Sequence, residues 1–160
     1  MAKIDPKLHM SAVEIDTLMT TCTRCRIATI GPQTEINLTP MTFGWAGGCV
    51  YIFGRGQKIA NLRRDPTSTI LVDIGEQWTE LQGVMMRGQA RVLETTEDEA
   101  HDPHLAAARL NLGAKHNLRE QDTVIPYGAS AAGRSRRWIV FTPTKIVSWN
   151  NENLSKDNAK

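Results

Sequence analysis

The feature that most restricts the fold of this chain is a series of short apolar runs separated by glycine, proline or polar turns. Alternating or continuous apolar patterns of this length favour β-strands. Strands are expected at residues 24–30, 35–43, 49–53, 69–73, 84–93, 138–141 and 145–149. Ala46-Gly-Gly48 is typical of a hairpin turn, so the first three strands are expected to form an antiparallel meander. Six or seven short, mostly antiparallel strands predict a mainly β fold, a small barrel with inserted helices.

Helices are expected to decorate this barrel. Ser11-Ala-Val-Glu14 is a capping box and predicts an N-terminal helix at about 12–20. A second short helix is expected at 57–64, and residues 96–118 are expected to hold helix that Pro103 interrupts. Within the strand at 84–93, Gly88 marks a bulge or a close backbone approach.

The composition indicates one globular domain over residues 1–160, with the barrel at about 24–149. The segment 121–135 is interpreted as an irregular loop and 150–160 as a polar tail. Nineteen Lys and Arg against 17 Asp and Glu leave a net charge of +2, and aromatic residues make up 6%. Neither value favours nucleic-acid binding. The sequence lacks a signal peptide and an apolar run of about 18 residues, so a cytoplasmic protein without a membrane span is expected.

The three cysteines are expected to be free thiols. Cys22 and Cys25 have the CxxC spacing of a redox pair or of half a zinc site. However, the sequence holds no second CxxC, and Cys25 falls inside an expected strand. No metal site is therefore predicted.

The segment Tyr51–Pro66 carries the most chemical information. It predicts a strand, a turn bracketed by Gly54 and Gly56, and the start of a helix. The start of a helix offers unpaired amides and a partial positive charge. Arg55 and Lys58 add two cations there, which suits a phosphate. The alternative is an ordinary basic helix with a solvated outer face, and the spacing alone leaves both interpretations open.

Several segments together resemble a known family. They are Ile27–Gly31, Leu38–Phe43, Gln57–Pro66 followed by Val72-Asp73, and Thr144–Trp149. Over residues 12–156 the chain resembles the pyridoxamine 5'-phosphate oxidase-like split β-barrels. Within that superfamily it is most similar to the flavin- and deazaflavin-dependent oxidoreductases (B class) of actinobacteria.

The resemblance implies an FMN-binding split β-barrel that forms a homodimer, with the deazaflavin coenzyme F-420, or alternatively FMN, in a groove between the subunits. It implies that Lys58 and Arg55 bind the cofactor phosphate and that Gln57 and Asn61 position that end. The strand segment beside the cofactor ring would be Thr39, Pro40, Met41 and Thr42. Trp78 is a further candidate, contributed by the facing subunit. The resemblance identifies no catalytic side chain.

The expected activity is hydride transfer from the reduced cofactor to an unsaturated small-molecule substrate. The alternatives are an FMN-binding oxidoreductase and a non-catalytic flavin- or haem-binding protein. The four histidines, which a haem site would use, lie outside the expected strands: His9, His101, His104 and His116. Vitamin B6 oxidation is not expected, because pyridoxamine phosphate oxidases carry a C-terminal motif with a histidine and none follows His116.

Overall fold

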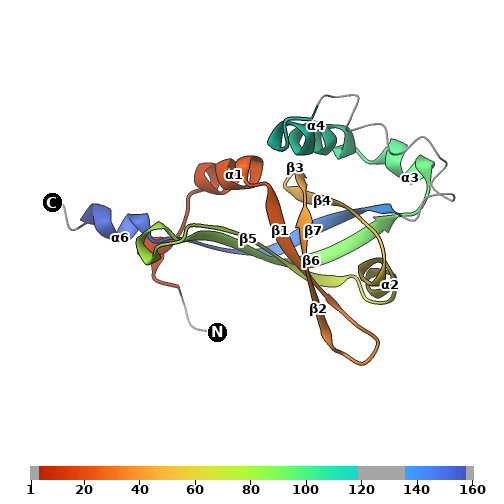
Figure 1. Ribbon diagram of the computed structural model, residues 1–160, viewed down its shortest axis with the longest axis horizontal. Coiled ribbons are helices and arrows are strands. Elements are labelled where there is room, and N and C mark those ends of the chain that lie inside the picture. The colour runs from red at the N-terminus through yellow and green to blue at the C-terminus, as the bar shows by residue number, and fades with distance from the viewer. Residues whose placement is uncertain (1–3, 119–135, 158–160) are drawn as a thin grey trace.

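A computed structural model describes residues 4–118 and 136–157 (Figure 1). Its centre is one seven-stranded sheet in which all paired neighbours are antiparallel, in the order β2-β1-β5-β6-β7-β4-β3. The strands are β1 (Arg24–Ile30), β2 (Ile36–Thr42), β3 (Gly44–Ala46), β4 (Cys49–Gly54), β5 (Thr67–Ile74), β6 (Gln82–Leu93) and β7 (Arg137–Asn150). The mainly β split-barrel fold is confirmed.

The helices are α1 (Ala12–Thr21), α2 (Gln57–Arg64), α3 (Thr96–His101), α4 (Leu105–Lys115) and α6 (Glu152–Asp157), with short 3-10 turns η1 (Pro6–Leu8) and η2 (Trp78–Glu80). Three helix predictions are confirmed: the capping box at Ser11, the helix at 57–64 and the interruption at Pro103. Figure 1 shows α1, α3 and α4 gathered on one side of the sheet.

The predicted meander of the first three strands is wrong. β2 pairs with β1 and β3 pairs with β4, and these two hairpins lie at opposite edges of the sheet. The chain changes course at Phe43, which is fully buried between β2 and β3. Local alternation identifies strands but does not say which strands pair, so the pattern could not show this separation.

The two strands predicted at 138–141 and 145–149 are one continuous strand, β7, which contains Pro143. A proline has no amide to donate to a ladder. Opposite it the register of β6 shifts between Arg87 and Gly88, and this irregularity accommodates the proline. The prediction of a bulge or a close backbone approach at Gly88 is confirmed: the register shifts between Arg87 and Gly88, where Thr144 of β7 has no paired residue in β6. A Cβ at Gly88 would lie 2.1 Å from the Thr142 carbonyl oxygen.

The C-terminal segment, predicted to be a polar tail, contains the helix α6. The Asn150 side chain accepts a hydrogen bond from the Glu152 amide at 3.0 Å, which caps the start of this helix. Asn151 docks the same region, since its amide donates to the Leu81 carbonyl at 2.9 Å. The loop predicted at 121–135 lies outside the described residues.

The core has two parts. The larger fills the barrel with side chains from the inner faces of the strands, and Ile59 and Leu62 of α2 join it. The smaller lies where α4 covers the sheet and includes Tyr51, Leu105 and Trp138. Within the ranges that the structure describes, no helix is long and apolar enough to cross a membrane.

Candidate functional site

The turn between β4 and α2 opens the first turn of the helix to solvent. Gly56 precedes α2 with φ +78° and ψ −149°, a conformation that side-chain-bearing residues rarely adopt. No side chain caps the helix at this end. The Ile59 amide donates to the Gly56 carbonyl at 3.0 Å. The first two amides of the helix, those of Gln57 and Lys58, are available to an external acceptor.

Arg55 and Lys58 place two cations at this helix start. The Lys58 Nζ donates to the Arg55 carbonyl oxygen at 3.0 Å, so the side chain folds back over the turn. Burial, and then the neighbouring Arg55 charge, lower the pKa of Lys58. Among the residues that the structure describes, neither cation has an acidic partner. Two unneutralised cations side by side favour an anionic ligand.

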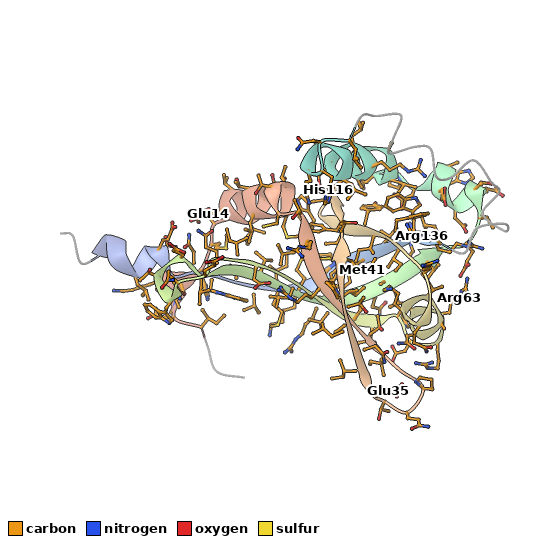
Figure 2. The ribbon with its side chains drawn as sticks, viewed as in Figure 1. Glu14, Glu35, Met41, Arg63, His116 and Arg136 are labelled. Atoms are coloured by element: carbon orange, nitrogen blue, oxygen red, sulfur yellow. The ribbon has the colours of Figure 1, made fainter. Side chains whose placement is uncertain are left out.

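The cations at the other end of α2 are engaged. Arg63 donates twice to the Glu94 carboxylate, each time at 2.7 Å, and Figure 2 shows Arg63 on α2. Arg64 donates to the Ile30 carbonyl oxygen. The helix is therefore not uniformly basic and solvated, because its available positive charge is concentrated at the N-terminal turn.

Gly54 brings the helix start close to β2. A Cβ at Gly54 would lie 3.1 Å from the Lys58 Cδ, 3.4 Å from the Ile139 Cδ1 and 3.6 Å from the Met41 Cε. Lys58 and Met41, predicted as site residues from separate segments, are thus near neighbours across this glycine. Figure 2 shows Met41 near the middle of the molecule.

The β2 segment next to this point is suited to contact a ligand through its backbone. Pro40 and Thr42 are exposed, whereas Thr39 and Met41 are half-buried. β2 is the last strand of the sheet order on its side. Its outer backbone groups therefore pair with no strand of the described chain.

Asn61 and Gln57 differ in their surroundings. Asn61 is fully buried, and its Nδ2 donates to the Thr29 Oγ1 at 3.0 Å while its Oδ1 accepts from the Gln57 Nε2 at 2.9 Å. Asn61 therefore ties α2 to β1. Gln57 is exposed at the helix start beside Lys58. The sequence pattern does not indicate Thr29, because no local motif signals a hydroxyl that contacts a helix residue 32 positions away.

Trp78 is not part of this cluster within one copy of the chain. It lies in η2 between β5 and β6, and its carbonyl accepts from the Asn151 Nδ2 at 2.6 Å. Figure 1 shows this turn beside α6, at the opposite end of the sheet from α2. The indole is 64% exposed, so it is available to a second molecule.

The described residues hold no cluster of three or more His, Cys, Asp or Glu that could bind a metal. The histidines lie next to helices: His9 follows η1, His101 ends α3, His104 precedes α4 and His116 follows it. The three thiols are free, and burial raises the pKa of Cys25 to about 12. Thiolate chemistry at Cys25 is thereby disfavoured at neutral pH.

Solved structures share this fold. A conserved hypothetical protein, Rv2991 from Mycobacterium tuberculosis, is 22% identical with a TM-score of 0.78, covering 96% of this chain and 93% of that chain. A protein described as an F420 reductase is 20% identical with a TM-score of 0.58, covering 82% and 94%. HutZ, a heme storage protein from Vibrio cholerae, is 12% identical with a TM-score of 0.64, covering 88% and 97%.

No curated protein matches the sequence. A family model described as Pyridoxamine 5'-phosphate oxidase does match it, over residues 12–150. The match spans the chain from α1 to the last residue of β7 and includes the whole helix-start cluster. This chain therefore belongs to the pyridoxamine 5'-phosphate oxidase family.

Proposed function

We propose that this chain is an oxidoreductase that binds coenzyme F-420, with FMN as the alternative cofactor, and reduces an unsaturated small molecule. One observation carries the proposal: Arg55 and Lys58, without acidic partners in the described chain, flank the uncapped start of α2. Both cofactors carry a phosphate group, and a helix start with adjacent cations binds phosphate well. The F420 reductase neighbour supports the fold's use for this purpose in another protein.

The residues around the helix start fit a phosphate group. Arg55 and Lys58 would neutralise it, and the amides after Gly56 would donate to its oxygens. Because Gly54 has no side chain, Lys58 lies close to β2. A cofactor whose phosphate binds at Arg55 and Lys58 would therefore extend toward Met41. Gln57 is exposed on the same turn and would donate to the same end of the cofactor.

The exposed edge of β2 is the proposed place of the ring. The segment Thr39, Pro40, Met41 and Thr42 would contact it chiefly through backbone N–H and C=O groups. When bound, the reduced cofactor supplies a hydride to the substrate. The protein's contribution is to orient the ring against β2 and to hold the phosphate. Trp78 would reach the ring only from a second copy of the chain, so the proposal includes a homodimer, which we place in the cytoplasm.

The test is a pair of fluorescence titrations with coenzyme F-420 and with FMN. We expect Arg55→Gln and Lys58→Gln each to weaken binding by about 10-fold or more, because each removes one charge-assisted contact worth about 1.5–3 kcal/mol. Lys58→Arg should retain most of the affinity. The matched control is Arg63→Gln on the same helix, since its guanidinium is engaged by Glu94.

Three results would count against the proposal. Unchanged affinity in both variants would remove the phosphate site from α2. A higher affinity for FMN than for coenzyme F-420 would identify FMN, the alternative, as the cofactor. Binding of neither cofactor, together with a haem spectrum, would favour a haem-binding role.

A further inference from the structure

A separate cleft lies at the other end of β1 from the candidate phosphate site. α2 contacts β1 at Thr29 and Ile30, whereas the cleft surrounds the beginning of the strand. Its volume is about 290 Å³. The side chains that matter for its chemistry are Cys22, Arg24, Arg26, Pro40, Asp73 and Ile74. They come from the end of α1 and from β1, β2 and β5.

The cleft carries a net positive charge. Arg26 forms an ion pair with Asp73, so these two charges offset each other. Arg24 is exposed and has no acidic partner in the described chain. Lys115 adds a third cation behind the cleft wall, since its charge opposes the rise in the pKa of Cys22 and of Cys25. The Asp73 carboxylate therefore offsets only one of the three positive charges of Arg24, Arg26 and Lys115.

The groups near this wall that could offset the charge are already engaged or neutral. The Met19 carbonyl oxygen at the end of α1 accepts from the Lys115 Nζ at 2.7 Å, and the Thr20 carbonyl accepts from the Asn111 side chain at 3.2 Å. Burial raises the pKa of Cys22, which keeps the thiol uncharged at neutral pH. The positive charge of Arg24 is therefore left to an external anion.

Two apolar side chains in an otherwise polar lining give the cleft a patch against which a carbon skeleton can pack. Pro40 is exposed on β2, and Ile74 is 42% exposed at the end of β5. We propose that this cleft binds a small amphipathic carboxylate, with its acid group at Arg24 and its apolar body against Pro40 and Ile74. Pro40 also belongs to the β2 segment proposed to contact the cofactor ring. We therefore identify the bound carboxylate as the substrate, an unsaturated acid, and this identification rests on the proposed function.

Cysteine alkylation provides a readout specific to this site. Cys22 lines the cleft, whereas Cys49 lies in β4 and is equally half-buried, so it serves as an internal control. The probes are cinnamate and its uncharged amide, cinnamamide, which have the same carbon skeleton. We expect cinnamate to slow alkylation of Cys22 by iodoacetamide, but not of Cys49, as measured by peptide mass spectrometry. Half-protection should need about 10-fold less cinnamate than cinnamamide.

Variants separate this site from the cofactor site. Arg24→Gln should remove the preference for cinnamate, and Arg24→Lys should keep most of it. Arg55→Gln should leave protection unchanged while it weakens cofactor binding. Calorimetric titration with both probes gives the affinities independently of the alkylation rate.

Equal protection by both probes, equal slowing of Cys49, or unaltered preference in Arg24→Gln would each overturn the proposal. If cofactor binding fails but the cinnamate preference and its loss in Arg24→Gln hold, the carboxylate site stands and the proposed function falls. If cofactor binding is confirmed but the preference for cinnamate is absent, the proposed function stands and the carboxylate site is rejected.

Discussion

At the scale of single residues, Asn61 shows how a candidate ligand contact can be a structural one. Its side chain is fully buried, and its polar atoms are occupied by Thr29 and Gln57. The family resemblance implied that Asn61 helps to position the phosphate end of a cofactor, and that role stays a prediction. The spacing of residues in the sequence could not predict the direction of the Asn61 side chain, because that direction depends on how α2 packs against β1.

We therefore expect Asn61→Ala to act mainly on stability. The substitution leaves the buried Thr29 hydroxyl without its donor, which should lower the free energy of unfolding by about 1–3 kcal/mol in urea denaturation. Gln57→Ala, at an exposed position of the same helix, should cost less than about 0.5 kcal/mol. A stable Asn61→Ala protein that had lost only cofactor affinity would show that Asn61 contacts the ligand directly.

Lys115 is a second residue that no sequence motif signalled. Its Nζ donates to the Met19 carbonyl at 2.7 Å and the Phe43 carbonyl at 3.2 Å, and it lies 3.4 Å from the centre of the Phe43 ring. It therefore joins α1, α4 and the start of β3. No carboxylate bonds to it in the described chain, and burial lowers the pKa of Lys115 to about 8.

This pKa predicts how stability depends on pH. The unfolded lysine has a pKa of about 10.4, so between about pH 8 and 10.4 the unfolded state binds more protons and the Lys115 contribution to stability rises with pH. After discounting for solvent screening of a half-buried group, the rise should be about 1–2 kcal/mol. The raised pKa values of Tyr51, Cys22 and Cys25 also make stability depend on pH, so the comparison must be made against Lys115→Met.

The measured quantity is the difference in free energy of unfolding between the wild type and Lys115→Met at pH 7.5 and at pH 10. We expect this difference to shift in favour of the wild type at the higher pH. A difference that stays constant would mean that Lys115 keeps an ordinary pKa in the folded protein, and one that shifts toward the variant would mean that folding raises the pKa of Lys115.

At the scale of elements, the sequence was most informative where strong local signals coincide. The capping box at Ser11, the helix at 57–64 and the break at Pro103 all depend on neighbouring residues, and all are confirmed. β7 was misread as two strands because a proline inside a run normally ends it. Only the partner strand shows why Pro143 is tolerated, since β6 shifts its register opposite that residue.

Gly88 allows the two strands to pair at this bulge, and its replacement tests that role. In Gly88→Ala the new Cβ would fall 2.1 Å from the Thr142 carbonyl oxygen and 2.9 Å from the Pro143 Cα, both backbone atoms. We expect a loss of about 2–3 kcal/mol in the free energy of unfolding, because the backbone must move to relieve the contact. Gln89→Ala, exposed at the next position, should change stability by about 0.5 kcal/mol or less. Equal stability of the two variants would argue against a tight bulge.

At the scale of the whole molecule, pairing between distant strands could not be read from the sequence. β1 pairs with β5 and β4 pairs with β7, and the members of each of these pairs are far apart along the chain. This order also brings Met41 and Lys58 together across Gly54. The sequence thus predicted most members of the candidate site, whereas their proximity depends on long-range pairing.

The same sheet order predicts where a second copy would bind. Leu71, Met85 and Val147 form a row across β5, β6 and β7, and all three are half-buried. Their neighbours Ile70 and Met86 point into the core and are fully buried, so the row lies on the opposite face. An apolar row across three strands favours burial against another protein surface, and we propose that this surface is a second copy.

We expect the wild type to sediment at twice the 17.8 kDa of one chain and Met85→Glu to sediment as a monomer. In a symmetric pair the substitution places two carboxylates in an apolar contact, where their desolvation is unfavourable. Leu110→Glu is the control, since Leu110 is 52% exposed on α4, away from this face. A monomeric wild type, or a dimeric Met85→Glu, would contradict the proposed interface. If the Met85→Glu monomer, which retains Arg55 and Lys58, no longer binds coenzyme F-420 or FMN, the cofactor groove requires both copies. If the monomer binds the cofactor with undiminished affinity, the whole cofactor site lies within a single chain.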